Sequence, residues 1–363
     1  MADINIIKDL SNAFGPSGFE EEVLKEVKKH CEGLELKNDA MNNVYASMPG
    51  KKGGRPVFML DAHTDECGFM VQAIQENGLL SIITLGGFHM TSLPAHTVIV
   101  RTASGRKIKG ITTSKPVHFM TAAQKADNSL AIEDILVDVG AVSRDEVVSE
   151  LGIQVGDPIM PDVTFEYDEE RGLCMGKAFD NRLGCMCIIE TMQALKEESD
   201  QLAVDVVGAF ASQEEVGMRG ATVTAQQVKP DMAIVFEGSP ADDSYFRVGI
   251  AQCCMRGGVQ IRHMDNSYVS NPVFIEYAHE IGKKYGIKYQ DAVRRGGSTD
   301  AGKISLTNQA VPVLVLGIPS RYVHSHYNFC SKEDIESTVK MAVEVIRGLN
   351  PEKIAHIMRQ DLL

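Results

Sequence analysis

The strongest constraint on the fold of this chain is a set of short apolar runs that contain no polar alternation. They lie at residues 56–60, 232–236 and 311–316. Strands of this composition are buried on both faces, which requires helices on both sides of a sheet. Segments with the apolar spacing of helices lie between and after them, at 181–195, 272–285 and 331–347. This order predicts an α/β domain whose sheet carries helices on both faces.

A stretch of different character separates the first of these strands from the others. From residue 67 to residue 165 the chain breaks into short β-like segments that are joined by turns. The segments 97–101 and 107–111 are predicted to be the two arms of a hairpin. We expect a discontinuous α/β domain of residues 1–66 and 166–363, into which a β-rich domain of residues 67–165 is inserted.

Charge and apolar content exclude several classes of function. The 363 residues include 36 Lys+Arg and 49 Asp+Glu, a net charge of −13, so the clustered cations that bind nucleic acid are absent. No apolar run approaches the ~18 residues of a membrane span, and the N-terminal sequence MADINIIKDLSNAF does not resemble a signal peptide. The 8 cysteines lack zinc-finger spacing, which predicts reduced thiols in a cytoplasmic protein.

Ionisable side chains follow each predicted strand, including a further strand at 202–210. In open α/β sheets, ligands bind beyond the carboxyl ends of the strands. The side chains in question, one of them at the start of a predicted helix, are His63, Asp65, Asp180, Glu214, Glu215, Glu237 and His324. A set of two imidazoles and several carboxylates suits Zn²⁺ or a similar divalent ion.

Each of these residues, taken alone, has a simpler explanation. Asp180 fits the N-cap of a helix, where Asp is favoured. Glu214 and Glu215 fit a solvated loop, and Glu237 fits the end of a strand. Chance would have to place five separate segments of this kind at one edge of the sheet. We therefore interpret the whole set as one metal site.

Two local patterns divide the roles within this set. In an extended segment residues i and i+2 point the same way, so Asp65 is expected to hold the imidazole of His63 in one tautomer. The adjacent Glu214 and Glu215 suit one metal ligand and one free base.

Three other motifs carry less chemistry. His279-Glu280 lacks the second histidine of a helical zincin site, because Lys283 stands in its place. The glycine-rich segment 296–300 lacks the frame of a phosphate-binding loop. Cys67 lies near His63 without an evident base and is predicted to be a buried thiol.

Six segments, in this order, resemble one known family. They are HTDE at 63–66, AFDNR at 178–182, QEEVGMRGA at 213–221, VFEGSP at 235–240, GGSTDAG at 296–302 and RYVHS at 321–325. The chain resembles the glutamyl aminopeptidase or tetrahedral (TET) aminopeptidase family of dinuclear metallopeptidases. The resemblance implies a mixed α/β sheet of the zinc-peptidase type, with an inserted β-rich, barrel-like domain that serves dimerisation.

Position by position, the resemblance implies two divalent metal ions per subunit, Zn or Co, that share Asp180 as a bridging ligand. His63 and Glu237 would complete one site, and Glu215 and His324 the other. Many members of the family have Asp where this chain has Glu237. The longer side chain keeps the ligand chemistry and changes the reach of the carboxylate.

The resemblance also implies the reaction and the assembly. Glu214 would be the general base, and Asp65 the partner that orients His63. The substrates would be peptides, which lose N-terminal residues one at a time, and the enzyme would be a homo-oligomer, either a dimer or a dodecamer. His326 stands where many members have Pro and adds an imidazole near the site.

The residues themselves indicate only metal-assisted hydrolysis, so other functions stay open at this point. A related dinuclear deacylase or carboxypeptidase would use the same metal set. A glycosidase would need facing carboxyl groups roughly 5–9.5 Å apart across a sugar, which neighbouring residues of one loop supply poorly. A scaffold with a degenerate site is disfavoured by the intact ligand set and by Glu214.

Overall fold

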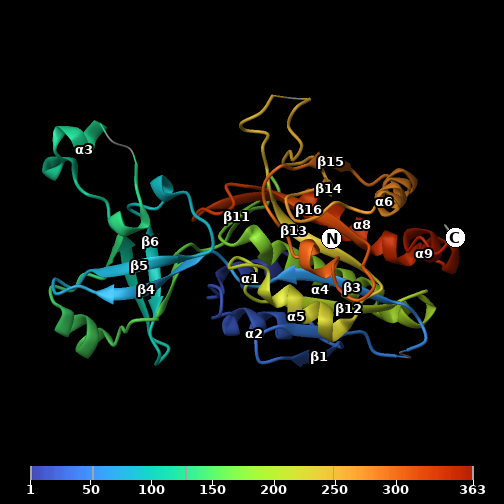
Figure 1. Cartoon of the computed structure of the whole chain (residues 1–363), viewed down its shortest axis with the longest axis horizontal. Coiled ribbons are helices and arrows are strands. Elements are labelled where there is room, and N and C mark those ends of the chain that lie inside the picture. Colours follow the sequence, from blue (N-terminus) through green and yellow to red (C-terminus); the bar gives the residue numbers. More distant parts are fainter. Residues whose placement is uncertain (1, 51–52, 127–128, 248, 362–363) are drawn as a thin grey trace.

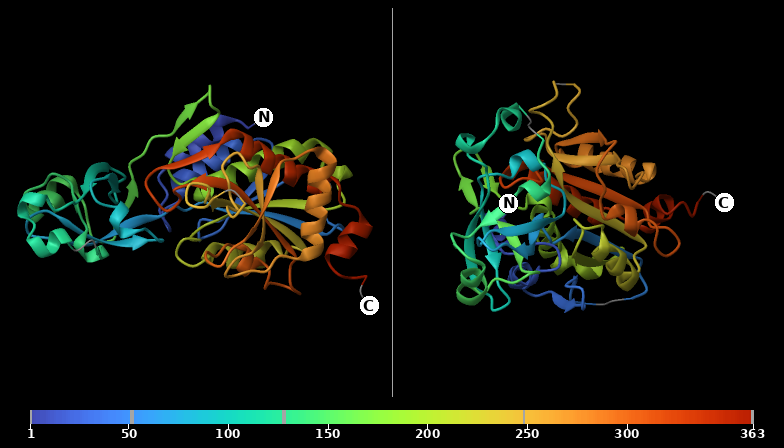
Figure 2. Two further views of the ribbon diagram at one scale, coloured as in Figure 1. Left: turned by 90° about the horizontal axis from the view of Figure 1, so that it is seen from above. Right: turned by 60° about the vertical axis from the view of Figure 1, so that its left-hand side comes forward.

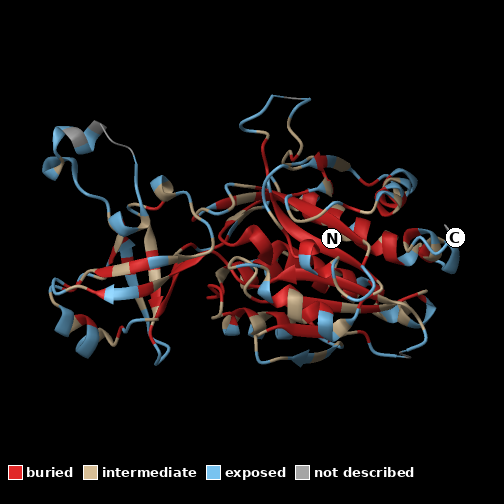
Figure 3. Ribbon diagram, in the orientation of Figure 1, coloured by how far each residue is buried: buried red, intermediate tan, exposed pale blue. Residues whose placement is uncertain are grey.

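The computed structural model of this chain describes residues 2–50, 53–126, 129–247 and 249–361. A large α/β body lies at the right of Figure 1, and a smaller β barrel lies at the left. Seen from above, the barrel projects from one end of the α/β body (Figure 2). Buried residues concentrate in the strands of the α/β body and in the helices that pack on them (Figure 3). No helix among the described residues is long and apolar enough to span a membrane.

Within the described residues, 11 strands form one mixed sheet. The hydrogen-bonded order is β1 (Glu35–Asn38), β2 (Val44–Ser47), β12 (Asp205–Ala211), β3 (Val57–His63), β13 (Met232–Pro240), β16 (Val313–Arg321), β17 (Asn328–Ser331), β11 (Leu173–Gly176) and β10 (Glu166–Asp168), with β14 (Val259–Met264) on β16 and β15 (Tyr289–Val293) on β14.

The helices of the α/β body are α1 (Ile4–Asn12), α2 (Glu21–His30), α4 (Phe179–Leu195), α5 (Arg219–Val228), α6 (Pro272–Tyr285), α7 (Ala301–Ile304), α8 (Lys332–Arg347) and α9 (Pro351–Ile357), and the barrel carries α3 (Ala122–Ala126). Shorter helical turns are η1 (Met90–Ser92), η2 (Val117–Phe119), η3 (Ile132–Asp134), η4 (Glu146–Leu151) and η5 (Lys196–Gln201).

The centre of the sheet is parallel, as the apolar runs predict. Strands β12, β3, β13 and β16 are neighbours in this order and run in one direction. Alternate residues of a strand enter different cores, so Phe58 and Leu60 pack on one side and Met59 on the other. Helices α1, α4, α6 and α8 cover the first side, whereas α5 and α7 cover the second. The predicted α/β class with helices on both faces is confirmed.

The strands continue past the apolar runs that predict them. β3 extends to His63, and β13 extends to Pro240. Glu237 therefore lies inside a strand, in register with Gly317, and the expectation that it follows a strand is wrong. The physical reason is that backbone hydrogen bonds hold the ladder together whether or not the side chains are apolar.

The barrel is closed by strands β4 (Gly68–Ile74), β5 (Leu80–Leu85), β8 (Leu136–Asp138), β7 (Lys107–Thr112), β6 (Thr97–Arg101) and β9 (Pro158–Pro161), in this order. β6 and β7 form the predicted hairpin, with Val98 opposite Gly110. The barrel has its own apolar core, which includes Phe69 and Val137. Its first and last strands, β4 and β9, are antiparallel neighbours, so the chain enters and leaves the barrel at one place.

A buried ion network joins the barrel to the α/β body. Glu66, which precedes β4, lies 2.6 Å from Nζ of Lys177 and 3.2 Å from Nη2 of Arg182. All three side chains are at most 2% exposed. Burial lowers the pKa of Lys177 to about 8, against the attraction of Glu66. The Glu66 carboxylate is therefore the anion that makes two buried cations tolerable at this junction.

Removal of this carboxylate should destabilise the protein strongly. We expect Glu66→Ala to lower the free energy of unfolding by about 3–5 kcal/mol, because two buried cations lose their partner. Urea denaturation followed by circular dichroism measures the change. Glu198→Ala is a matched control, because it removes an exposed ion pair with Arg347 and should cost less than about 1 kcal/mol. Equal costs in the two variants would contradict the role given to Glu66.

Candidate active site

The structure brings the predicted side chains to the carboxyl ends of the parallel strands. His63 ends β3, and Glu214 and Glu215 lie in the loop that follows β12. His324 lies in the loop after β16, and Asp180 lies in the first turn of α4. These segments meet because parallel neighbours end at the same edge of the sheet.

Asp180 lies between the two histidines. Its Oδ1 is 3.1 Å from Nε2 of His63, and its Oδ2 is 3.4 Å from Nε2 of His324. Burial raises the pKa of Asp180, but hydrogen bonds with His324 and His63 outweigh it and hold the pKa below its usual value. The carboxylate is therefore anionic, with one oxygen toward each imidazole.

Asp65 orients both His63 and the loop after β12. Nδ1 of His63 lies 3.3 Å from Oδ1 of Asp65. The Asp65 carboxylate also accepts hydrogen bonds from the hydroxyl of Ser17 at 2.5 Å and from the backbone N–H groups of Glu214 at 2.9 Å and Glu215 at 3.1 Å. This arrangement confirms that Asp65 reaches the imidazole of His63. Sequence reasoning missed Ser17, which is distant in the chain.

The two adjacent glutamates face different histidines. Oε2 of Glu214 lies 3.8 Å from Nε2 of His63, and Oε2 of Glu215 lies 3.9 Å from Nε2 of His324. Among the described residues, His63, Asp180 and Glu215 each offer a ligand atom within 4.8 Å of the others. Ligand atoms at this spacing could hold one divalent cation.

A second group of converging ligand atoms includes Cys67, which the sequence predicts to be only a buried thiol. Cys67, Glu215 and His324 also offer ligand atoms within 4.8 Å of one another. Sγ of Cys67 lies 3.6 Å from Nδ1 of His324, and the same nitrogen lies 2.7 Å from the backbone oxygen of Gly87. Burial raises the pKa of Cys67 well above its usual value, so it is a neutral thiol. It packs behind His324 and leaves Nε2 of His324 directed at Asp180.

Glu237 lies beside this group without joining it. It lines the same cavity as Asp180 and Glu214, and it accepts a hydrogen bond of 3.3 Å from Nδ2 of Asn181. Burial, followed by the negative charge of Asp180, raises the pKa of Glu237 well above its usual value.

The site contains more buried carboxyl groups than its two histidines can neutralise. Burial raises the pKa of Glu215 to about 7 and that of Glu214 well above its usual value. The hydrogen bond to Asp180 raises the pKa of His324 to about 10. Carboxylates in this condition gain free energy from a cation placed among them. The donor set of imidazole nitrogens and carboxylate oxygens fits Zn²⁺ and similar ions.

A cavity of about 420 Å³ opens beside these residues. Its far wall comes from Arg262 of β14 and from the segment that follows β15, including Arg294, Arg295 and the glycines of the 296–300 segment. No sequence signal identified the arginines, because they carry no motif.

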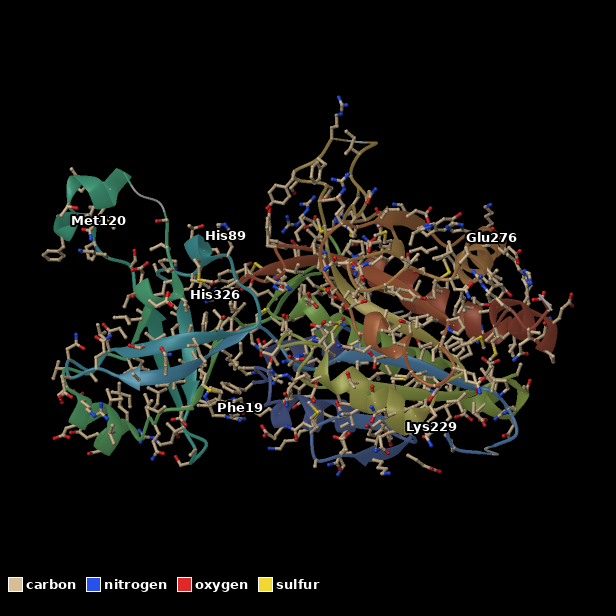
Figure 4. The ribbon with its side chains drawn as sticks, viewed as in Figure 1. Phe19, His89, Met120, Lys229, Glu276 and His326 are labelled. Atoms are coloured by element: carbon tan, nitrogen blue, oxygen red, sulfur yellow. The ribbon has the colours of Figure 1, made fainter. Side chains whose placement is uncertain are left out.

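Two further carboxyl groups, those of Asp61 and Asp300, are buried behind the site. Burial raises the pKa of Asp61 to about 7. His326 lies at the junction of the two bodies (Figure 4). Its ring stacks on that of His96, with ring centroids 4.1 Å apart. Burial lowers the pKa of His326 to about 3, so this extra imidazole is neutral and packs between domains.

The geometry agrees with comparisons to known proteins. The family model described as M42 glutamyl aminopeptidase matches residues 42–341. The glutamyl aminopeptidase of Lactococcus lactis subsp. cremoris (strain MG1363) is 30% identical over 353 residues, which cover 97% of this chain and 98% of that protein.

Solved structures share the fold over almost the whole chain. A TET aminopeptidase from the Thaumarchaeota archaeon SCGC AB-539-E09 has a TM-score of 0.92 at 34% identity and covers 98% of this chain and 99% of its own. The TET1 peptidase of Pyrococcus horikoshii, described as able to assemble into a tetrahedron or a large octahedral shell, has a TM-score of 0.83 at 26% identity and covers 95% and 99%. This chain belongs to the M42 glutamyl aminopeptidase family and is a peptide hydrolase.

Proposed function

We propose that this chain removes N-terminal residues from peptides with two divalent metal ions, Zn²⁺ or Co²⁺, held around Asp180. The observation that carries the proposal is the Asp180 carboxylate, which turns one oxygen toward His63 and the other toward His324. A carboxylate placed in this way suits two ions at once. His63 would complete one ligand set together with Glu237, whose carboxylate would turn from Asn181 toward the ion. Glu215 and His324 would complete the other.

The chemistry divides between the ions and the side chains. Bound divalent ions would polarise the scissile carbonyl and lower the pKa of the attacking water. Glu214 has its carboxylate in the same cavity. It would take a proton from the water and give it to the nitrogen of the leaving amine as the C–N bond breaks. Asp65 would keep the proton of His63 on Nδ1, so that Nε2 stays free as a ligand.

The wall of the cavity supports a preference for an acidic N-terminal residue. Arg262 is paired with Asp265 at 3.3 Å, and Arg294 is paired with Asp242 at 3.4 Å. Arg295 lines the cavity from an exposed position. A guanidinium there would form a charge-assisted pair with the side-chain carboxylate of a bound glutamate or aspartate.

The bridging role of Asp180 predicts a distinct pattern of metal loss. Asp180→Ala should remove both ions, because each would lose a ligand, whereas His324→Ala should weaken mainly one. Elemental analysis after dialysis at equal free Zn²⁺ measures the bound equivalents. Full occupancy in Asp180→Ala would refute the bridging assignment.

The two adjacent glutamates predict different effects: loss of one should lower the catalytic rate, and loss of the other should lower the metal occupancy. Glu214→Gln keeps its size and hydrogen bonding but cannot take the proton. We expect normal metal content and kcat lower by about 10²- to 10⁴-fold. Glu215→Gln, its neighbour and matched control, should lose metal affinity and be partly rescued by excess metal. Metal loss in Glu214→Gln with retention in Glu215→Gln would exchange the two roles.

The acidic preference can be tested with aminoacyl-anilides. Arg295→Ala should lower kcat/KM for a glutamyl anilide by about 10- to 100-fold, the worth of one charge-assisted hydrogen bond, and change the leucyl anilide little. Arg359→Ala removes an exposed arginine of the C-terminal segment and serves as the control. A carboxypeptidase would use the same arginine for a substrate carboxylate and would accept N-blocked peptides. Cleavage of such peptides would overturn the aminopeptidase proposal.

The barrel supports a homo-oligomer, either a dimer or a dodecamer. Large apolar side chains lie exposed on it, among them Ile111, Phe119 and Val142, which are 51%, 73% and 82% exposed. Burial of such side chains against a second subunit would be favourable. Light scattering at micromolar concentration should give a multiple of 39.6 kDa, and a monomer would refute the proposal.

A further inference from the structure

Another group of side chains that commonly bind metal ions lies outside the active site, where α6 packs beside β14 and β15. His263 comes from β14, His279 from α6 and Asp291 from β15. β14 and β15 are parallel neighbours with α6 between them in the chain (Figure 1, upper right). One atom of each side chain lies within 4.8 Å of the other two.

The three side chains converge on one point. Nε2 of His263 and Nε2 of His279 each lie 2.7 Å from the same oxygen, Oδ1 of Asp291. The ring of His279 is stacked on Tyr289, with centroids 5.0 Å apart and an interplanar angle of 21°. Tyr289 is two residues before Asp291 and so shares its face of β15. The stacking therefore fixes the direction in which His279 presents its nitrogen.

We propose that His263, His279 and Asp291 form a second binding site for a transition-metal dication such as Zn²⁺, separate from the active site. Two imidazoles and one carboxylate form a common ligand set for this ion, with water as the fourth ligand. In the metal-free protein the imidazole N–H groups donate to Asp291. For an ion to bind, each imidazole would carry its proton on Nδ1, so that Nε2 offers its lone pair to the ion.

The spacing needs little adjustment to hold an ion. Zn²⁺ takes nitrogen and oxygen ligands at about 2.0–2.2 Å, which places tetrahedral donor atoms roughly 3.3 Å apart. The present 2.7 Å would open by about half an ångström through rotation of the side chains. Their exposures of 36%, 24% and 46% leave room for this movement and for the water.

A further group of histidine and carboxylate side chains shows what an unsuitable cluster looks like. Asp9, Glu26 and His30 also converge within 4.8 Å. Nζ of Lys29 lies 2.6 Å from Asp9 and 3.3 Å from Glu26, so an ammonium already holds the place of the cation. The ion pairs of Asp291, in contrast, are with the two imidazoles.

The position of this second site gives it a structural consequence. His263 follows Arg262 in β14, where the pairing with β15 shifts its register. Arg262 lines the active-site cavity, whereas the ring of His263 lies beside that of His279 on α6. Arg294 follows the last residue of β15. An ion here would tie β14 and β15, which position the arginine wall, to α6.

The test counts bound metal in the full-length protein. Wild type, His279→Ala and Asp291→Asn are stripped with a chelator, dialysed against equal free Zn²⁺ and analysed by mass spectrometry of the element. We expect both variants to bind one equivalent fewer per subunit than wild type. Alanine is a good helix former and asparagine matches aspartate in shape, so both variants should fold.

The matched control is His356→Ala, which removes a His–Asp pair that no third ligand joins among the described residues; Nδ1 of His356 lies 2.6 Å from Asp361. It should bind as much Zn²⁺ as wild type. Peptide hydrolysis by the loaded variants should match wild type, and the rise in melting temperature with added Zn²⁺ should shrink only in His279→Ala and Asp291→Asn. Equal metal counts in all four proteins, or metal loss that removes activity in parallel, would overturn the proposal.

Discussion

The arrangement of the active site depends on the contacts of one carboxylate, that of Asp65. It lies against Nδ1 of His63, and it accepts hydrogen bonds from the hydroxyl of Ser17 and from two backbone N–H groups of the loop that carries Glu214 and Glu215. A buried anion with this many donors is stable as an anion. One side chain thus sets both the tautomer of a histidine and the placement of two glutamates, which would otherwise move independently.

The strand-borne part of this site could be predicted from the sequence, because parallel strands end together. His63 and His324 follow apolar runs, so their common edge was predictable without knowledge of contacts. Glu237 was misplaced, since backbone pairing carries β13 beyond its apolar residues. The roles within the set could be named only through resemblance to a family, because spacing does not reveal which carboxylate faces which imidazole.

The remaining features on which the proposals rest could not be predicted, for one physical reason. The arginine wall and the His263, His279 and Asp291 group join side chains from elements that meet only after folding. Sequence separation hides such contacts, and neither group carries a local motif. His279 has no helical zincin motif around it, yet it faces two partners from neighbouring strands, Asp291 and His263.

The junction of the two bodies has a consequence for how such a chain is assembled from modules. β4 and β9 lie side by side where the barrel begins and ends, and Glu66 forms an ion pair with Lys177 just inside the α/β body. The two points at which the barrel is inserted into the host domain are therefore close together. The barrel can lengthen, shorten or change its outer surface during evolution, while these two points of the host domain keep their positions.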